Sequence, residues 1–362
     1  MPNWLWVLTV IPALGFLVFV HELGHFLTAL RMGIKVEEFG FGYPPRIATL
    51  THWRGVPVTL NWLPLGGFVR MAGEEGNFDV EGSLAQAPPW KKIPVMAAGA
   101  IMNILAAIVI FGIVGMYEPL GPVTVTNVSP GSPAEQAKLQ AQDVILEVDG
   151  QPVDSTRELQ AMIKERQGQA TKLDVQRSDP QSGDTTFNVT VTPANGVIGV
   201  GITVPTNKVT DHHYDFNPLH ALSFGLEQTW LWAGRMIAGV GLIIGSFFGA
   251  TQTQATGGFA GPVGIARITG QVAREGGLIS YLNLTALISV NLAVFNLLPI
   301  PALDGSRIVF ALVEWVRRGK RVPPEKEAMV HAVGMIALLG LMLLVTFSDV
   351  RNIWLGRDAF GG

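Results

Sequence analysis

The sequence predicts a polytopic α-helical membrane protein with four transmembrane helices, a membrane-associated β-loop and an inserted extracytoplasmic α+β domain. Three observations support this fold class. Four apolar runs are long enough to cross a bilayer, and only 15% of the residues are charged. The mean hydropathy is +0.35, yet one section of soluble composition interrupts the apolar runs, with about the length of a small domain.

The four apolar runs are spread along the whole chain. A helix of roughly 20 apolar residues crosses the hydrocarbon core of a bilayer. We place the runs at Trp4 to Leu30, Ile93 to Met116, Leu278 to Leu298 and Met329 to Phe347. The first run lacks a basic segment before it and is long enough to span, so we interpret it as a retained anchor and not a cleaved signal peptide.

Lysine and arginine indicate the orientation of these helices. Basic residues follow the first run and separate the third run from the fourth, so both connections are expected in the cytoplasm. The α+β domain then lies outside the cytoplasm. An odd number of crossings would break this arrangement, so we expect residues 217–248 to lie at the membrane interface.

Strand and capping signals occupy the polar sections. Residues 56–62 alternate between apolar and polar, and we expect residues 36–41 to pair with them as a β-loop near the membrane. In the α+β section, Ser132 and Ser155 each begin a capping box and therefore a helix. Strands are expected there at 144–148, 172–176 and 186–192.

A metal-binding motif lies inside the first apolar run, which reads His21-Glu22-Leu23-Gly24-His25. Residues four apart share one face of a helix, so His21 and His25 can bind one Zn²⁺, with Glu22 beside them as general base. Asp304 lies just beyond the inner end of the third run and is expected at the same depth as the two histidines, near the cytoplasmic edge of the bilayer. Three protein ligands and one open position form the pattern of a catalytic zinc site.

Simpler readings of these residues stay open at this point. The five-residue motif also occurs without metal, and Asp304-Gly305 alone is a turn signal. Asn291 and Asn296, near the metal end of the third run, either hold a peptide backbone or bond between helices. The chain has no cysteine, which excludes thiolate ligands, and its net charge of −3 gives no sign of a nucleic-acid partner.

Together these motifs resemble the site-two protease family of intramembrane zinc metalloproteases. The resemblance rests on the first-run motif and on residues 296–305 (NLLPIPALDG), and it is greatest for the bacterial regulator-of-sigma-E-protease branch. Residues 129–153 resemble the core of a PDZ domain, and only one such domain fits, where well-known members of the branch have two. Residues 98–103 (AGAIMN) also resemble a family segment, with Ala100 where proline is usual.

The resemblance implies roles for individual residues. His21, His25 and Asp304 match the zinc ligands, Glu22 the catalytic base, and Asn291 and Asn296 the substrate-binding asparagines. The strand that contains Val58, Leu60 and Trp62 matches a membrane-reentrant β-loop that pairs edge-on with an extended substrate. Taken together, these roles come from the resemblance, because residue spacing alone does not assign all of them.

The resulting hypothesis is an intramembrane zinc endopeptidase of the bacterial inner membrane that makes the second cut in regulated intramembrane proteolysis. Its substrate would be a single-span membrane protein of the anti-sigma-factor kind, already shortened by another protease, with a new C-terminus able to bind the PDZ-like domain. The alternatives are a catalytically idle PDZ scaffold with a structural metal site and a metal-handling membrane protein.

The hypothesis divides the chain into segments with expected roles. These are 1–35 (first transmembrane helix), 36–92 (β-loop and cytoplasmic-side loop), 93–117 (second transmembrane helix), 118–205 (PDZ-like domain), 206–277 (interfacial helices and Gly-rich connection), 278–305 (third transmembrane helix), 306–327 (basic cytoplasmic loop) and 328–362 (fourth transmembrane helix and tail).

Overall fold

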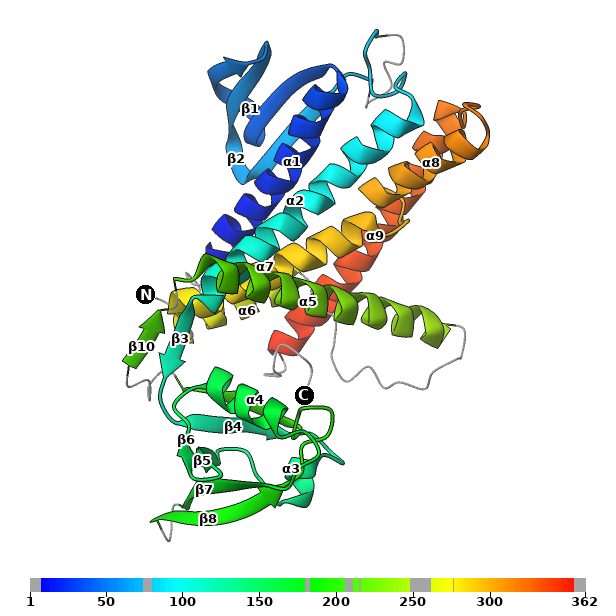
Figure 1. Cartoon of the computed structure of the whole chain (residues 1–362). Helices are drawn as coiled ribbons and strands as arrows, with labels where there is room; N and C mark the ends of the chain where they lie inside the picture. Colours follow the sequence, from blue (N-terminus) through cyan, green and yellow to red (C-terminus); the bar gives the residue numbers. More distant parts are fainter. Residues whose placement is uncertain are drawn as a thin grey trace. The chain divides into compact units, whose positions relative to one another are not determined.

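The computed structural model describes residues 8–73, 80–179, 183–205, 211–214, 216–247, 262–275 and 277–354. The chain forms two compact units, one of Met1–Val114 with Ala221–Gly362 and one of Gly115–His220. Figure 1 shows the long helices and a β-hairpin in the first unit, and a small sheet with short helices in the second. The start of the first expected span and the beginning of the Gly-rich connection lie outside the described residues.

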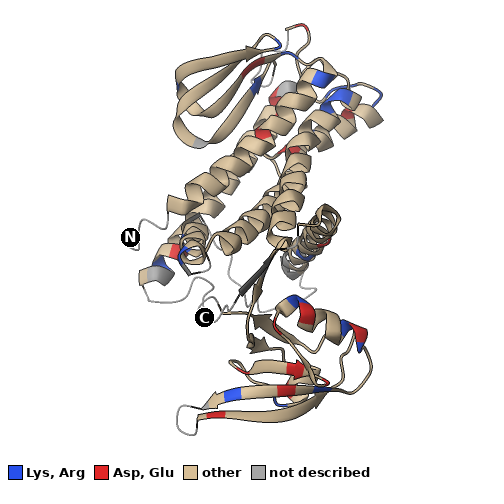
Figure 2. Ribbon diagram, turned by 60° about the vertical axis from the view of Figure 1, so that its left-hand side comes forward, with Lys and Arg blue, Asp and Glu red and all other residues tan. Residues whose placement is uncertain are grey.

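The helices of the first unit account for the four predicted spans. They are α1 (Val10–Met32), α2 (Pro89–Gly115), α5 (Pro218–Phe247), α6 (Pro262–Glu275), α7 (Gly277–Leu297), α8 (Asp304–Val316) and α9 (Pro324–Trp354). Four of the described helices, α1, α2, α7 and α9, are long and apolar enough to cross a membrane. Charged residues are sparse along the middle of these helices, and Lys and Arg collect at one end (Figure 2). The protein is therefore a membrane protein.

Helix α1 places the metal-binding motif at its centre. The helix ends at Gly33, which adopts a left-handed conformation (φ 71°) and donates its N–H to the carbonyls of Ala29 and Leu30. His21 is at the midpoint of this 23-residue helix. The prediction placed His21 near the cytoplasmic edge because it counted from Trp4; the bounds of α1 place it about 16 Å from either end.

The sheet beside α1 is formed by β1 (Val36–Trp53) and β2 (Val56–Met71), which pair antiparallel. The register confirms the predicted contact of residues 36–41 with 56–62, because Phe39 faces Val58. Phe39 also faces Val69, so residues 39–41 lie between 58–60 and 67–69. Phe39 stacks on Phe26 of α1, with ring centroids 4.5 Å apart, so the inner face of the sheet is buried against the helix.

Three further helices lie between the spans, and two of them, α6 and α8, differ from the expected connections. Helix α5 is not among the described helices that qualify as spans, in agreement with the four-span prediction. In Figure 1 it crosses α2 steeply, where Gly225 fits against the carbonyl of Ile108. The prediction of a plain loop after Asp304 is wrong, because α8 occupies its first half. Helix α6 likewise occupies the end of the Gly-rich connection. Both helices are amphipathic. In the sequence, the charged residues of one segment and the glycines of the other hid this helical periodicity.

The second unit is a small α+β domain. Its main sheet has the order β8-β7-β5-β4-β9, with β6 against β5, and a separate ribbon pairs β3 with β10. Both predicted capping boxes are confirmed, because Ser132 Oγ accepts the N–H of Glu135 and Ser155 Oγ that of Glu158. Its elements are β3 (Tyr117–Leu120), β4 (Val123–Val128), α3 (Pro133–Gln136), β5 (Val144–Val148), β6 (Gln151–Pro152), α4 (Thr156–Glu165), β7 (Thr171–Asp179), β8 (Gly183–Val191), β9 (Val200–Thr203) and β10 (Asp211–Tyr214).

Candidate metal centre

Three side chains predicted as metal ligands meet in the first unit. His21 Nε2 lies 3.0 Å from Asp304 Oδ2, His25 Nε2 lies 3.2 Å from the same oxygen, and the two Nε2 atoms are 3.2 Å apart. The two histidines are buried, and Asp304 is largely buried. Residues separated by more than 270 positions therefore present three ligand atoms to one point.

The spacing of these atoms fits a zinc ion. Zinc binds nitrogen and carboxylate oxygen at about 2.0–2.2 Å, so neighbouring ligands of a tetrahedral ion lie about 3.3 Å apart. The observed triangle has sides of 3.0, 3.2 and 3.2 Å. Without a cation, protons on the imidazole Nε2 atoms would have to bridge them to Asp304 Oδ2 as hydrogen bonds, and a bound cation replaces these protons. The donor set and its geometry therefore suit zinc, with one coordination position left for a reactant.

Helix α2 fixes the imidazole rings from behind. Nδ1 of His25 donates to the backbone carbonyl of Val95 at 2.7 Å, which leaves Nε2 for the metal. One turn further along α2, Gly99 passes directly beside both rings. A Cβ there would lie 2.5 Å from Nε2 of both His21 and His25. Gly24 of α1 likewise has no room for a side chain against the backbone of α2. Glycine on both helices thus permits the close contact that shapes the site.

The turn between α7 and α8 presents the third ligand. Gly305 follows Asp304, and a Cβ at this position would collide with the carbonyls of Leu297 and Leu298 at the end of α7. Glycine is therefore needed after Asp304 because of this close approach, and not only because an Asp-Gly pair favours a turn. Two residues before the ligand, Ala302 has φ 77°, which is unfavourable for any residue with a Cβ.

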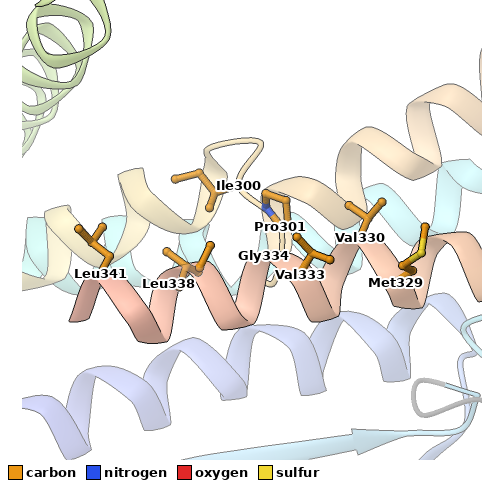
Figure 3. Close-up of a pocket in the computed structure, with 9 residues that line it drawn as sticks. Ile300, Pro301, Met329, Val330, Val333, Gly334, Leu338 and Leu341 are labelled. Carbon is orange, nitrogen blue, oxygen red and sulfur yellow. The ribbon is translucent and has the colours of Figure 1, made fainter. Parts of the chain in front are cut away.

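Helix α9 supports this turn from its other side. The N–H of Ala302 donates to Nδ1 of His331 at 3.1 Å, and Gly334 leaves space for Pro301. Figure 3 shows Ile300 and Pro301 facing α9 across a cavity of about 500 Å³. Its lining is apolar and holds no titratable side chain, so the cavity is separate from the polar ligand set.

Glu22, the predicted base, faces the sheet. Its Oε2 accepts the backbone N–H of Val69 in β2 at 3.2 Å. The adjoining part of β2 packs closely on α1, because Gly66 contacts Val18 and Gly67 contacts Phe19. The strand nearest to the base is therefore the last part of β2.

The predicted peptide-binding strand differs from this arrangement. Residues 58–60 are flanked on one side by 39–41 and on the other by 48–51, so they offer no free edge to an extended peptide. Val58 is also buried against α1. Leu60 is 39% exposed and Trp62 69% exposed, which leaves both on the surface of the sheet. Edge-on pairing at Val58 and Leu60 is thus wrong, because they lie on an inner strand.

The two predicted substrate-binding asparagines lie on α7. Asn291 and Asn296 are partly buried, and within the described residues neither side chain is engaged in a hydrogen bond. Sequence reasoning noted residues 98–103 but did not connect Val95, Gly99 and Asn103 with the metal site, although they follow one another at four-residue spacing along α2. This spacing matches that of the two histidines and could have indicated a facing helix.

The sequence is similar to known proteins over nearly its whole length. The sequence pattern of peptidase family M50 matches residues 9–341. A Clostridium perfringens protein, whose name assigns it provisionally to the zinc metalloproteases, is 34% identical over 360 residues, which cover 96% of this chain and 98% of that protein. The zinc metalloproteases RasP of Geobacillus kaustophilus and Bacillus licheniformis are 28% and 29% identical, each over 96% of this chain and over 98% and 99% of their own length.

Proposed function

Because the chain belongs to peptidase family M50 and is a zinc metalloprotease of the RasP-like branch, we propose that it cuts a peptide bond within the transmembrane segment of another membrane protein. One observation carries this proposal. The triangle of His21, His25 and Asp304 is formed at the centre of a helix that is long and apolar enough to span a membrane. A site at that depth meets peptide bonds that are themselves in the bilayer.

In this proposal the three side chains bind zinc and Glu22 moves protons. Zinc held there supplies Lewis acidity toward a carbonyl and activates water for attack. Glu22 accepts the proton of the attacking water and then gives one to the leaving amine. Its bond to the N–H of Val69 holds the carboxylate in one orientation beside β2.

The substrate must be extended when it is cut. The peptide bonds of a helix are enclosed by their own hydrogen bonds, and water cannot reach their carbonyl carbons. We infer that an unwound segment lies along residues 67–71 of β2, the strand beside Glu22, in place of the inner strand 58–60. The free amides of Asn291 and Asn296 are suited to bind the backbone of such a segment.

The second unit is proposed to act as an extracytoplasmic PDZ-like domain. Among the described residues, its edge strand β9 pairs only with β4, so the other edge of β9 is proposed to add a peptide strand. The proposed substrate is a single-span, anti-sigma-factor-like protein of the bacterial inner membrane that another protease has already shortened. The new C-terminus would then bind at β9.

The decisive experiment compares wild-type protein with the Glu22→Gln variant on a purified single-span substrate in lipid vesicles. We expect Glu22→Gln to retain zinc and to lose cleavage by 100-fold or more, because the base contributes about 10²–10⁴-fold. Glu37→Gln, the same change at an exposed position of β1, is the matched control and should cleave like wild type. Equal cleavage by Glu22→Gln and wild type would contradict the proposal. Zinc-loaded wild type that cleaves no membrane substrate would favour the idle scaffold.

A further inference from the structure

Asn103 lies behind the metal centre in a position that the reaction does not explain. It belongs to α2 and is fully buried, and its side-chain nitrogen lies 3.3 Å from Nδ1 of His21. Its side-chain oxygen Oδ1 is also buried and receives no hydrogen bond from any residue that the structure describes. The backbone carbonyl of Asn103 is bonded separately, by the hydroxyl of Ser289 at 2.7 Å.

The direction of this hydrogen bond decides whether His21 can bind a metal. If the amide nitrogen donates to Nδ1, a neutral imidazole carries its proton on Nε2. Nε2 is the atom that faces His25 Nε2 and Asp304 Oδ2, and a proton there would block a metal. If the amide oxygen accepts from Nδ1–H instead, Nε2 keeps its lone pair. Rotating the amide by 180° exchanges the two cases within nearly the same volume.

The neighbouring histidine shows the required arrangement. Nδ1 of His25 points to the carbonyl of Val95, which can only accept a hydrogen bond. Val95 and Asn103 are eight residues apart on α2, with Gly99 between them, so they lie on one face of the helix. This face provides an acceptor for one imidazole, space for both rings, and an amide for the other imidazole.

We propose that Asn103 is a positioning residue that accepts a hydrogen bond from Nδ1–H of His21 through its amide oxygen, and so selects the tautomer that binds zinc. The proposal rests on the role of His21 as a zinc ligand. It adds that α2, which supplies no ligand, determines the protonation of both ligating rings. Partners of this kind typically change metal affinity by about 10- to 100-fold when they are removed.

The test measures zinc affinity of the full-length protein in detergent by competition with a chromophoric chelator. Asn103→Leu removes the acceptor and keeps the branched shape of the side chain, and we expect affinity to fall about 10- to 100-fold. Asn103→Asp lacks the amide N–H and, when ionised, can only accept, so its affinity should stay near that of wild type. Ser289→Ala removes a bond to the backbone of the same residue without touching the amide, and it should also bind normally. Absorption bands of the Co²⁺-substituted forms give a second, activity-independent readout.

The outcomes separate this inference from the proposed function. Wild-type affinity in Asn103→Leu would overturn it, as would a folded Asn103→Asp that loses as much affinity as Asn103→Leu. Thermal unfolding of the metal-free proteins shows which variants are folded. If Asn103→Leu does not fold, Asn103→Asp decides alone, because retained zinc supports an acceptor and lost zinc refutes one. Failure of the wild type to bind zinc would instead contradict the proposed function.

Discussion

Gly99 allows a direct prediction, because its absent side chain defines the space for the two histidines. A Cβ at position 99 would lie 2.5 Å from Nε2 of His21 and of His25, whereas such contacts need at least 3.0 Å. Each ring must then move by about 0.5 Å or the helices must separate. Zinc sites tolerate about 0.2 Å in ligand distance, so the required shift is too large. We expect Gly99→Ala to lower zinc affinity by about 10- to 100-fold.

The helices have little freedom to relieve this contact. Gly24 already brings α1 against the backbone of α2, so separation would sacrifice packing on both sides of the site. Overpacking of this kind costs about 1–3 kcal/mol, which leaves the folded state populated. Zinc content and chelator competition measure the metal, and thermal unfolding measures the fold. Gly340→Ala, in α9 with open space around it, is the control. Normal zinc affinity in Gly99→Ala would refute the reasoning.

Three further predictions concern the Asp304 turn and the second unit. Gly305→Ala should lower zinc content, because its Cβ would collide with carbonyls of α7 and displace the ligand; unchanged zinc would contradict this. Ala302→Gly should raise the free energy of unfolding by about 1 kcal/mol, because it removes an unfavourable φ while the N–H bond to His331 stays. Thermal unfolding of the two forms measures the change. The pKa of Asp149 is lowered, first by the N–H of Lys172 and then by an arginine, so its ionised form stabilises the fold. This stabilisation is fully present at pH values above the ordinary pKa of 3.8, and it is lost as the pH falls through the lower pKa of the folded state. Asp149→Asn should therefore make the unfolding of the second unit less dependent on acid pH.

The sequence was informative about the site where local periodicity specifies geometry. Four-residue spacing on a helix brought His21 and His25 together, and the end of an apolar run indicated Asp304. The residues behind the rings were not connected with the site, because four-residue spacing on a second apolar helix does not show which helix faces α1. Gly99 reads in sequence as one of many membrane-helix glycines, and Asn103 reads as a bond between helices. Their roles depend on which helix faces α1, and that is a property of tertiary packing.

The fold shows the same limit in its sheet. Alternation correctly predicted that residues 36–41 and 56–62 pair, since period-two patterns mark half-buried strands. It could not reveal that residues 67–71 lie on the outer side of 39–41 and next to Glu22. Glycines at 66 and 67 read as a break, whereas they serve the close contact of β2 with α1. The strand that the sequence indicated for substrate pairing therefore lies two positions away, across residues 39–41, from the strand beside Glu22.

The glycine contact between α1 and α2 also bears on which metal ions the site accepts. Both imidazoles project from α1, and Gly99 of α2 lies directly beside their Nε2 atoms, so α2 limits the space into which either ring can move. A cation of larger radius would therefore be accommodated by movement of the Asp304 turn. One hydrogen bond, from the N–H of Ala302 to His331, links the backbone of this turn to α9. If the three side chains bind zinc as we propose, a larger cation would have to displace the Asp304 carboxylate, so close helix packing would favour small divalent ions.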